Sequence, residues 1–404
     1  MKDINITSLD HFGRGVGKID DKIIFVENAL PGEIVDINVT KEKKNYIEAE
    51  VSNYKTLSKD REEAKCPYYK ECGGCNIMHM PYSKQLEFKE NKIKEIINKF
   101  LNFPISINPI INSEEYYYRN KITLQIKNKI GLYKKKSYDL VNIDNCIITD
   151  NRVKEVINRL NDLDLSNIEQ IVIRFSDNET MIVISSLKEI NFKNFISQLK
   201  DVCTSIIVKH KNNYTTIYGN DYIILKLNNY NFKVSAESFF QVNTNQAIKM
   251  YDLIKKYAKG SKNVLDLYCG TGSIGIYASD VVENITGIEI NKYAIEDAIE
   301  NAKFNNINNI KFICGDVKNN LKEFKNIDVI IVDPPRSGLD KEAIDNILKL
   351  SPNKIVYVSC DPITLSRDLK ILSEFYNIEE ITPIDMFPNT YHVESVTILN
   401  RKRR

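Results

Sequence analysis

The sequence has no long apolar run, almost no net charge and no internal repeat. No stretch approaches the ~20 consecutive apolar residues of a membrane helix, so a membrane-spanning protein is not expected. The amino terminus carries Asp3 and Asp10 and lacks the apolar core of a signal peptide, which predicts a cytoplasmic protein. The net charge is only +2, so any surface for nucleic acid must be local.

The length predicts several domains. A chain of 404 residues exceeds one ordinary hydrophobic core, and its 43 % hydrophobic content is that of a globular protein. We expect a multidomain α/β protein with boundaries near residues 57 and 236, giving domains 1–57, 58–236 and 237–404.

The first of these domains reads as all-β. Short β-rich runs separated by Gly13, Gly15, Pro31 and Gly32 predict a small barrel of the oligonucleotide-binding (OB) kind. A protein-interaction module that binds no nucleic acid fits the same pattern equally well.

The start of the second domain contains a cluster of cysteines. Eight cysteines in a long chain without a secretion signal argue against a disulfide scaffold. Cys66, Cys72 and Cys75 fall within one loop, where Gly73 and Gly74 free the backbone to wrap a bulky centre. Cys146 is the candidate for a fourth ligand. The spacing fits structural zinc and an iron–sulfur cluster equally well.

The rest of the second domain mixes strands and helices and carries a basic segment. Residues 116–138 hold seven basic side chains, five tyrosines and no acid. Cations that pair with phosphates, interleaved with aromatics that stack on bases, suit single-stranded RNA. An ordinary solvated face has the same composition, so the segment alone does not decide.

The third domain alternates strand and helix five times. Such alternation predicts a doubly wound, mostly parallel sheet. The apolar runs expected to be strands are residues 264–268, 285–288, 310–313, 329–332 and 355–358.

A glycine turn after the first of these strands indicates an adenosine cofactor. Gly270-Thr-Gly272-Ser-Ile-Gly275 fits the dinucleotide fingerprint, and Glu289 ends the next strand, where a carboxylate can accept both ribose hydroxyls. NAD and S-adenosylmethionine both satisfy this pattern. Asp266 favours S-adenosylmethionine, because a carboxylate attracts its sulfonium and amino groups and would repel a pyrophosphate. Asp316, after the third strand, is placed to meet the adenine amino group.

A thiol and a late acid suggest covalent catalysis. Cys360 ends a strand, where open α/β sheets hold their ligands, and Glu394 follows far downstream. Carbon 5 of uracil is a poor nucleophile until a thiolate adds to carbon 6, and a base must later remove the carbon 5 proton. Cys360 and Glu394 match these two needs, and Asp333 is placed to hold the pyrimidine edge or the cofactor. A buried inert cysteine and a surface acid are the plainer alternatives.

Five motifs in order resemble the RNA 5-methyluridine methyltransferases. The resemblance covers essentially the whole chain and is strongest to the ribosomal branch, which has an amino-terminal TRAM domain and an iron–sulfur cluster. Three positions depart from the family pattern: Asp361 stands where Asn is expected, and Asn389 and Tyr391 replace the usual His and Gly. The motifs are Phe239-Phe-Gln-Val-Asn243, Asp266-Leu-Tyr-Cys-Gly270, Asp333-Pro-Pro-Arg336, Ser359-Cys-Asp-Pro362 and the stretch Met386 to Glu394.

The resemblance implies a class I Rossmann-like methyltransferase domain that modifies 23S ribosomal RNA. It implies that Cys360 is the nucleophile, that Glu394 is the base, and that the four cysteines Cys66, Cys72, Cys75 and Cys146 hold a [4Fe–4S] cluster. We expect a monomer without an obligate protein partner. S-adenosylmethionine contacts are implied at Gln241, Tyr268, Ser273, Glu289 and Asp333, and the glycine-turn argument adds Gly270 and Asp316.

Three other functions remain open. The transfer RNA branch of the same family typically lacks the TRAM-like barrel and the cysteine cluster, so both features count against it. An NAD-dependent oxidoreductase rests on residues 270–275 alone. A non-catalytic RNA-binding protein would leave Cys360, Glu394 and Asp333 together without a purpose.

Overall fold

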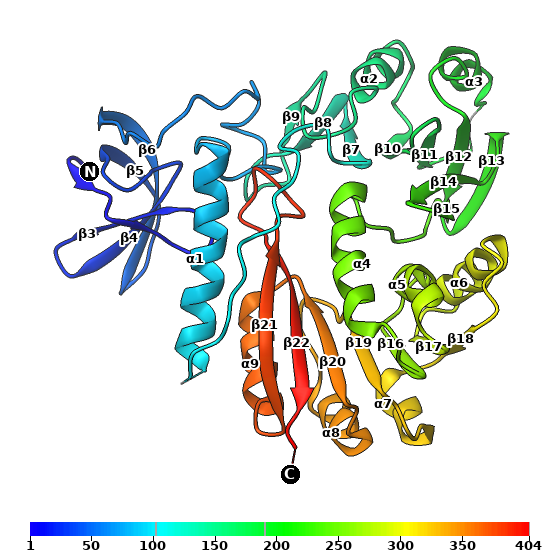
Figure 1. The fold of residues 1–404 in the computed structure, drawn as a ribbon. Helices are drawn as coiled ribbons and strands as arrows, with labels where there is room; N and C mark the ends of the chain where they lie inside the picture. Colours follow the sequence, from blue (N-terminus) through cyan, green and yellow to red (C-terminus); the bar gives the residue numbers. More distant parts are fainter. Residues whose placement is uncertain (102, 190, 404) are drawn as a thin grey trace. The chain divides into compact units, whose positions relative to one another are not determined.

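The computed structural model describes residues 1–101, 103–189 and 191–403 and divides the chain into two compact units (Figure 1). The first unit comprises Met1–Lys92, Leu132–Val141 and Phe387–His392. The second unit comprises Ile93–Gly131, Asn142–Met386 and Val393–Arg404. Among the described residues, no helix has the length and apolarity needed to cross a bilayer.

The first unit is built on a six-stranded sheet, which confirms the prediction of an all-β amino-terminal region. Alternate side chains along the strands form its core, among them Ile24, Val26 and Ile47. Gly17 is required there, because a Cβ atom would lie 2.8 Å from the Ile4 side chain. The strand order is β1-β5-β6-β4-β3-β2, with β1 (Ile4–Asn5), β2 (Ser8–Leu9), β3 (Gly15–Ile19), β4 (Lys22–Glu27), β5 (Ile34–Glu42) and β6 (Tyr46–Thr56).

The long helix α1 (Tyr82–Phe100) follows the cysteine loop, and its first half belongs to the first unit. Here it meets the late loop, which we define as residues 387–392. Lys89 Nζ donates to the carbonyl oxygen of Phe387 at 3.0 Å, and Lys92 Nζ to that of Tyr391 at 2.9 Å. Two buried or nearly buried lysines therefore fix the backbone of the late loop.

The second unit contains most of a mixed seven-stranded sheet and two helices, α2 (Val153–Asn161) and α3 (Lys193–Leu199). A two-stranded sheet, β14 (Tyr222–Leu227) and β15 (Tyr230–Ser235), follows it in the chain. The order in the larger sheet is β13-β12-β11-β10-β7-β8-β9. Its strands are β7 (Lys121–Lys127), β8 (Lys129–Tyr133), β9 (Leu140–Asn142), β10 (Ile168–Phe175), β11 (Thr180–Ser186), β12 (Ser205–His210) and β13 (Asn213–Gly219).

The last sheet has the order β18-β17-β16-β19-β20-β22-β21, and its first five strands are parallel, as the alternating pattern predicts. All four residues of β19 are buried, since helices cover both faces of such a sheet. The strands are β16 (Asn263–Leu267), β17 (Asn284–Glu289), β18 (Ile310–Cys314), β19 (Val329–Val332), β20 (Lys354–Ser359), β21 (Tyr376–Ile384) and β22 (Glu394–Arg401). The helices are α4 (Thr244–Ala258), α5 (Ser273–Ala278), α6 (Lys292–Phe304), α7 (Val317–Asn320), α8 (Lys341–Leu350) and α9 (Pro362–Leu372).

Two strands of this sheet were not predicted from the sequence. β21 and β22 run antiparallel to their neighbours, and β22 lies between β20 and β21 (Figure 1). This insertion brings the region of Glu394 to the strand that ends at Cys360.

Candidate active site

Cys360 and Glu394 lie next to each other because of strand register. In the antiparallel pair of β20 and β22, Ser359 lies opposite Ser395. Cys360 directly follows Ser359, and Glu394 directly precedes Ser395, so the two side chains meet at the same edge of the sheet. Asp333 follows β19, the other neighbour of β20, and ends at that edge too.

The carboxyl ends of the five parallel strands gather the other acidic candidates. Asp266 and Glu289 lie at the ends of β16 and β17, and Asp316 follows β18. The structure therefore brings the predicted cofactor acids and the predicted catalytic residues to one edge of one sheet, where open α/β sheets bind ligands.

Burial sets the protonation of this site. Desolvation, together with the neighbouring Asp333, raises the pKa of Glu394 to about 8. Desolvation also raises the pKa of Cys360 to about 11, with the Glu394 carboxylate adding to the effect. Near neutral pH the site thus holds a thiol and a largely protonated carboxyl group.

Arg336 is a functional candidate that the sequence reasoning missed. Its guanidinium lowers the pKa of both Cys360 and Glu394, against the larger effect of burial. Its place in the Asp333-Pro-Pro-Arg336 turn, next to a residue already singled out, was the signal available in the sequence.

The glycine turn has a backbone that few residues adopt. Tyr268, Gly270 and Gly272 all have positive φ, at 62°, 52° and 73°. A Cβ atom on Gly272 would lie 2.6 Å from the ring of Phe312, so this position requires glycine. Glu289 braces the turn, because its Oε2 accepts a hydrogen bond from the Gly270 amide at 3.3 Å.

Asp266 is the most informative acid in this turn. It is fully buried, and its Oδ2 accepts a hydrogen bond from the Gly275 amide at 3.0 Å. Its Oδ1 has no hydrogen-bond partner within the part of the chain that the structure describes. Burial raises the pKa of Asp266 to about 7. A buried acceptor without a partner is costly, and a ligand that donates to it would remove that cost.

The remaining cofactor candidates have structural contacts of their own. Ser273 begins α5, and its Oγ lies 2.8 Å from the Tyr251 hydroxyl. Asp316 caps α7 by accepting from the Lys318 amide at 3.0 Å. The carbonyl oxygen of Gln241, just before α4, accepts from Asn120 Nδ2 at 3.0 Å.

Two departures from the family pattern have a structural role here. Asp361 caps α9, since its Oδ1 accepts from the amides of Ile363 and Thr364 at 2.9 and 3.1 Å. Asn389 is buried with a φ of 66°, a conformation that Asn tolerates better than most residues. Gln85 holds it from both sides, accepting from its amide at 2.8 Å and donating to its Oδ1 at 3.2 Å.

The predicted four-cysteine centre is not confirmed. None of the cysteines forms a disulfide, and Cys72 is buried whereas Cys66, Cys75 and Cys146 are partly exposed. Cys146 belongs to the second unit and the other three to the first. Over residues 1–101, 103–189 and 191–403, no group of three or more His, Cys, Asp or Glu side chains is arranged to hold a metal ion.

Three adjacent lysines of the basic segment, Lys134, Lys135 and Lys136, already have partners within the first unit. Lys134 Nζ lies 2.7 Å from Glu71, and Lys136 Nζ lies 3.0 Å from Glu27. Lys135 Nζ lies 4.7 Å from the centre of the Tyr69 ring. The basic segment itself contains no acid, so the acids that pair with its lysines, Glu71 and Glu27, come from distant parts of the chain.

The family-model comparison assigns most of the chain. Residues 81–402 match the model described as tRNA (Uracil-5-)-methyltransferase, and residues 1–52 match the TRAM domain. The chain is 35 % identical to an uncharacterized RNA methyltransferase of Staphylococcus aureus, across all of this chain and 98 % of the relative. An uncharacterized RNA methyltransferase of Clostridium tetani is 36 % identical, across 98 % of this chain and 95 % of the relative.

A solved structure matches almost the whole chain. It is the Pyrococcus abyssi tRNA (uracil-54, C5)-methyltransferase in complex with S-adenosyl-L-homocysteine, with a TM-score of 0.83, 28 % identity and 99 % coverage of both chains. The fold, the motifs at the strand ends and both matched family models indicate the same family. The chain is a member of the tRNA (uracil-5-)-methyltransferase family with an amino-terminal TRAM domain.

Proposed function

We propose that this protein transfers a methyl group from S-adenosylmethionine to carbon 5 of a uridine in 23S ribosomal RNA. The observation that carries the chemistry is the register of β20 and β22, which sets a thiol beside a carboxyl group at the ligand-binding edge of the sheet. The membership in a uracil-5-methyltransferase family leaves no support for the oxidoreductase alternative.

The proposed reaction begins with Cys360. Its thiolate adds to carbon 6 of the uracil ring, and the electron pair of the carbon 5–carbon 6 double bond moves onto the ring as an enolate. Because burial raises the pKa of Cys360 to about 11, the thiol must lose its proton to solvent as the substrate binds, and Arg336 assists by stabilising the thiolate.

Glu394 completes the reaction as the general base. When bound, S-adenosylmethionine supplies an electrophilic methyl group, which carbon 5 takes up. Glu394 acts in its ionised form, which is the minor form near neutral pH because its pKa is about 8. It accepts the carbon 5 proton, the double bond re-forms, and the bond between carbon 6 and the Cys360 sulfur breaks to release the thiolate. Asp333 is assigned to hold the pyrimidine edge or the cofactor.

Asp266 and Glu289 are the main residues proposed to hold the cofactor. The partner-less Oδ1 of Asp266 suits a cationic donor such as the amino group or the sulfonium, and Glu289 suits the ribose hydroxyls. The further contacts proposed are Gln241, Tyr268, Gly270, Ser273, Asp316 and Asp333.

Ribosomal RNA is proposed as the substrate on the strength of the cysteine loop, which resembles that of the ribosomal branch. Transfer RNA is the second candidate, since the matched Pyrococcus abyssi enzyme is named for a tRNA uridine. That enzyme aligns with 99 % of this chain, so the amino-terminal domain does not by itself separate the two substrates. We assign RNA contacts to residues 1–57 and 58–236 and the chemistry to residues 237–404.

Mapping 5-methyluridine in a strain that lacks this gene tests the substrate. We expect one or more sites to be lost from 23S ribosomal RNA, with transfer RNA unchanged, and to return when the gene is restored. Loss confined to transfer RNA would replace the ribosomal assignment with the second candidate. An unchanged pattern in both RNAs would overturn the proposed function.

The nucleophile is tested with RNA that carries 5-fluorouridine at the mapped site. The fluorine cannot leave as a cation, so the native enzyme should stop as a covalent thioether after methyl transfer. Cys360→Ala should form no adduct and should not methylate normal RNA, whereas Cys203→Ala, which changes a buried cysteine two residues before β12, should retain both activities. Activity in Cys360→Ala would exclude this mechanism.

A further inference from the structure

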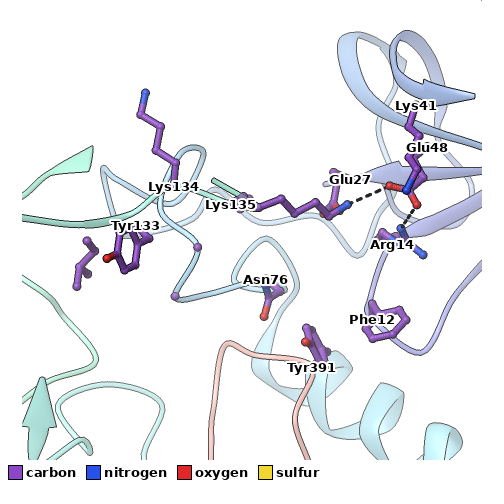
Figure 2. A pocket seen from close by; sticks show the side chains of 14 residues that line it. Phe12, Arg14, Glu27, Lys41, Glu48, Asn76, Tyr133, Lys134, Lys135 and Tyr391 are labelled. Atoms are coloured by element: carbon purple, nitrogen blue, oxygen red, sulfur yellow. Dashed lines mark ion pairs between the residues drawn. The ribbon is translucent and has the colours of Figure 1, made fainter. Parts of the chain in front are cut away.

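The first unit contains a pocket of about 820 Å³ that the reaction described above does not use (Figure 2). Its walls come from the turn before β3, from strands β4, β5 and β6, from the cysteine loop, from residues 132–136 and from the late loop. Figure 2 shows Phe12, Asn76 and Tyr391 grouped on one side of this pocket and Tyr133 on the other.

Aromatic rings form the distinctive part of the pocket. Phe12 is 53 % exposed, although a phenylalanine ring is normally buried. It meets Tyr391 edge to face, with 5.4 Å between ring centres and an interplanar angle of 87°. The Arg14 guanidinium lies 5.4 Å from the centre of the Phe12 ring. Accessible aromatic faces with an adjacent guanidinium are typical of sites that stack unpaired nucleobases.

Charges in the wall favour a base over a bare phosphate. Five cationic side chains and two carboxylates, Glu27 and Glu48, line the pocket, leaving an excess of positive charge. Lys134, Lys136 and Arg14 are already paired with acids, whereas Lys41 forms no ion pair within the described residues. The pocket therefore attracts a polyanion moderately and offers its aromatic rings for contact.

Tyr391 connects this pocket to the proposed base. Its carbonyl is held by Lys92 Nζ, which also lies 5.1 Å from the centre of its ring, so its position is fixed before a ligand binds. Tyr391 precedes Glu394 by three residues, and three extended residues span at most about 10 Å. A base stacked on Tyr391 thus belongs to a nucleotide close to the target uridine.

We propose that this pocket binds one unpaired nucleobase near the target uridine and thereby helps to select the site of methylation. The inference rests on the proposed function and adds to it a base-recognition site made by Phe12, Tyr391 and Arg14. Stacking is tolerant of base identity, so selection acts mainly on whether an unpaired base is available at that distance.

The test combines variants with base removal in the RNA. The probe is a short transcript around the mapped uridine, in which each base near the target is replaced in turn by an abasic site. At one position, base removal should raise the KM of the native enzyme about tenfold, the size expected for one lost stacking contact. In Phe12→Ala the KM should already be raised by that factor, and the same abasic site should raise it no further.

Controls separate stacking from general damage. Phe12→Trp should keep the KM near the native value, and all Phe12 variants should keep the affinity for S-adenosylmethionine. Phe375→Ala removes an equally accessible phenylalanine at the start of β21 and should leave the KM for RNA unchanged. If abasic effects and Phe12→Ala add independently, or if Phe12→Ala leaves the KM unchanged, the pocket proposal is overturned while the methyl-transfer proposal stands. If the native enzyme methylates no RNA, it is the proposed function that fails.

Discussion

Arg336 opposes the effect of burial on the pKa of Cys360, the proposed nucleophile. It is exposed, whereas Cys360 and Glu394 lie where desolvation raises both pKa values. The nearby cation therefore opposes burial at the point where a thiolate must form.

Removing that cation should slow the modification of Cys360. In Arg336→Met the pKa of the thiol should rise, because the largest interaction that lowers it is lost. We expect alkylation by iodoacetamide at pH 8 to 10 to slow severalfold but less than ~10-fold, since an exposed charge is screened by solvent. Peptide mass spectrometry measures the rate, with the exposed Cys314 as an internal control. An unchanged rate at Cys360 would exclude this role for Arg336.

Glu394→Gln should arrest the reaction after methyl transfer. The nucleophile and the methyl donor remain, but no base removes the carbon 5 proton, so a covalent complex with unmodified RNA should accumulate. Turnover should fall by ~10²–10⁴. Denaturing gel electrophoresis detects the complex, and Glu374→Gln, at an exposed acid after α9, provides the control. Normal turnover without the complex would place the base elsewhere.

At the scale of elements, the parallel strands could be predicted from the sequence, whereas β22, the antiparallel strand that brings Glu394 to Cys360, could not. β16 to β20 are short apolar runs followed by helices, so their order of appearance is plain in the sequence. β21 and β22 carry polar residues on exposed ends, and their register depends on how the chain between them turns back. Residues 387–392 of that chain are fixed by Lys89 and Lys92 of α1, about 300 residues earlier. No local pattern encodes such a contact.

Contacts between distant parts of the chain also explain why the pairing of the lysines in the basic segment could not be predicted from the sequence. Residues 116–138 contain no acid, which favoured a surface free to bind phosphates. Glu27 and Glu71 reach Lys136 and Lys134 from separate strands and loops, so the local charge run said little about the folded surface. Phe12 and Tyr391, nearly 380 residues apart, likewise form one pocket wall only after folding.

The cysteine loop gives a prediction at the same scale. Anaerobically purified protein should contain iron and sulfide in equal amounts and little zinc, because the resemblance to the ribosomal branch implies a [4Fe–4S] cluster, although the cysteine spacing alone fits zinc equally well. Replacing Cys66, Cys72, Cys75 or Cys146 by Ser should each lower the iron content, and Cys314→Ser should not. Elemental analysis and visible absorbance provide the measurement. Stoichiometric zinc, or no metal at all, would contradict the predicted cluster, and only the absence of metal would agree with the thiol arrangement of the described residues.

At the scale of the whole molecule, one sheet edge concentrates acids that are buried, as Asp266 is, or partly buried, as Asp333 and Glu394 are. The pKa of Asp333 is raised to about 6, that of Asp266 to about 7 and that of Glu394 to about 8, in each case mainly by burial. Protons therefore leave this edge between about pH 5.5 and 8.5, and each lost proton makes the site more attractive to a cation.

Affinity for the methyl donor should therefore depend on pH. S-adenosylmethionine carries a sulfonium charge and S-adenosylhomocysteine does not, so raising the pH from 5.5 to 7.5 should increase the affinity for the first relative to the second. About tenfold is expected if one carboxylate interacts strongly, since one pKa unit corresponds to a factor of ten. Isothermal titration calorimetry measures both ligands, and Asp266→Asn should flatten the difference. Parallel pH profiles would show that these acids do not face the sulfonium.

The position of β22 at the end of the chain also bears on the order in which the two proposed catalytic residues, Cys360 and Glu394, are synthesised. β21 pairs only with β22 in this sheet, and β22 is synthesised after every other strand of it. During translation, Cys360 is therefore made before Glu394, the residue proposed to release it from RNA. Until β22 enters, however, β20 has an open edge and the nucleophile has no finished site. With the proposed roles of Cys360 and Glu394, the capture and the release of RNA both require the pairing of β20 with β22.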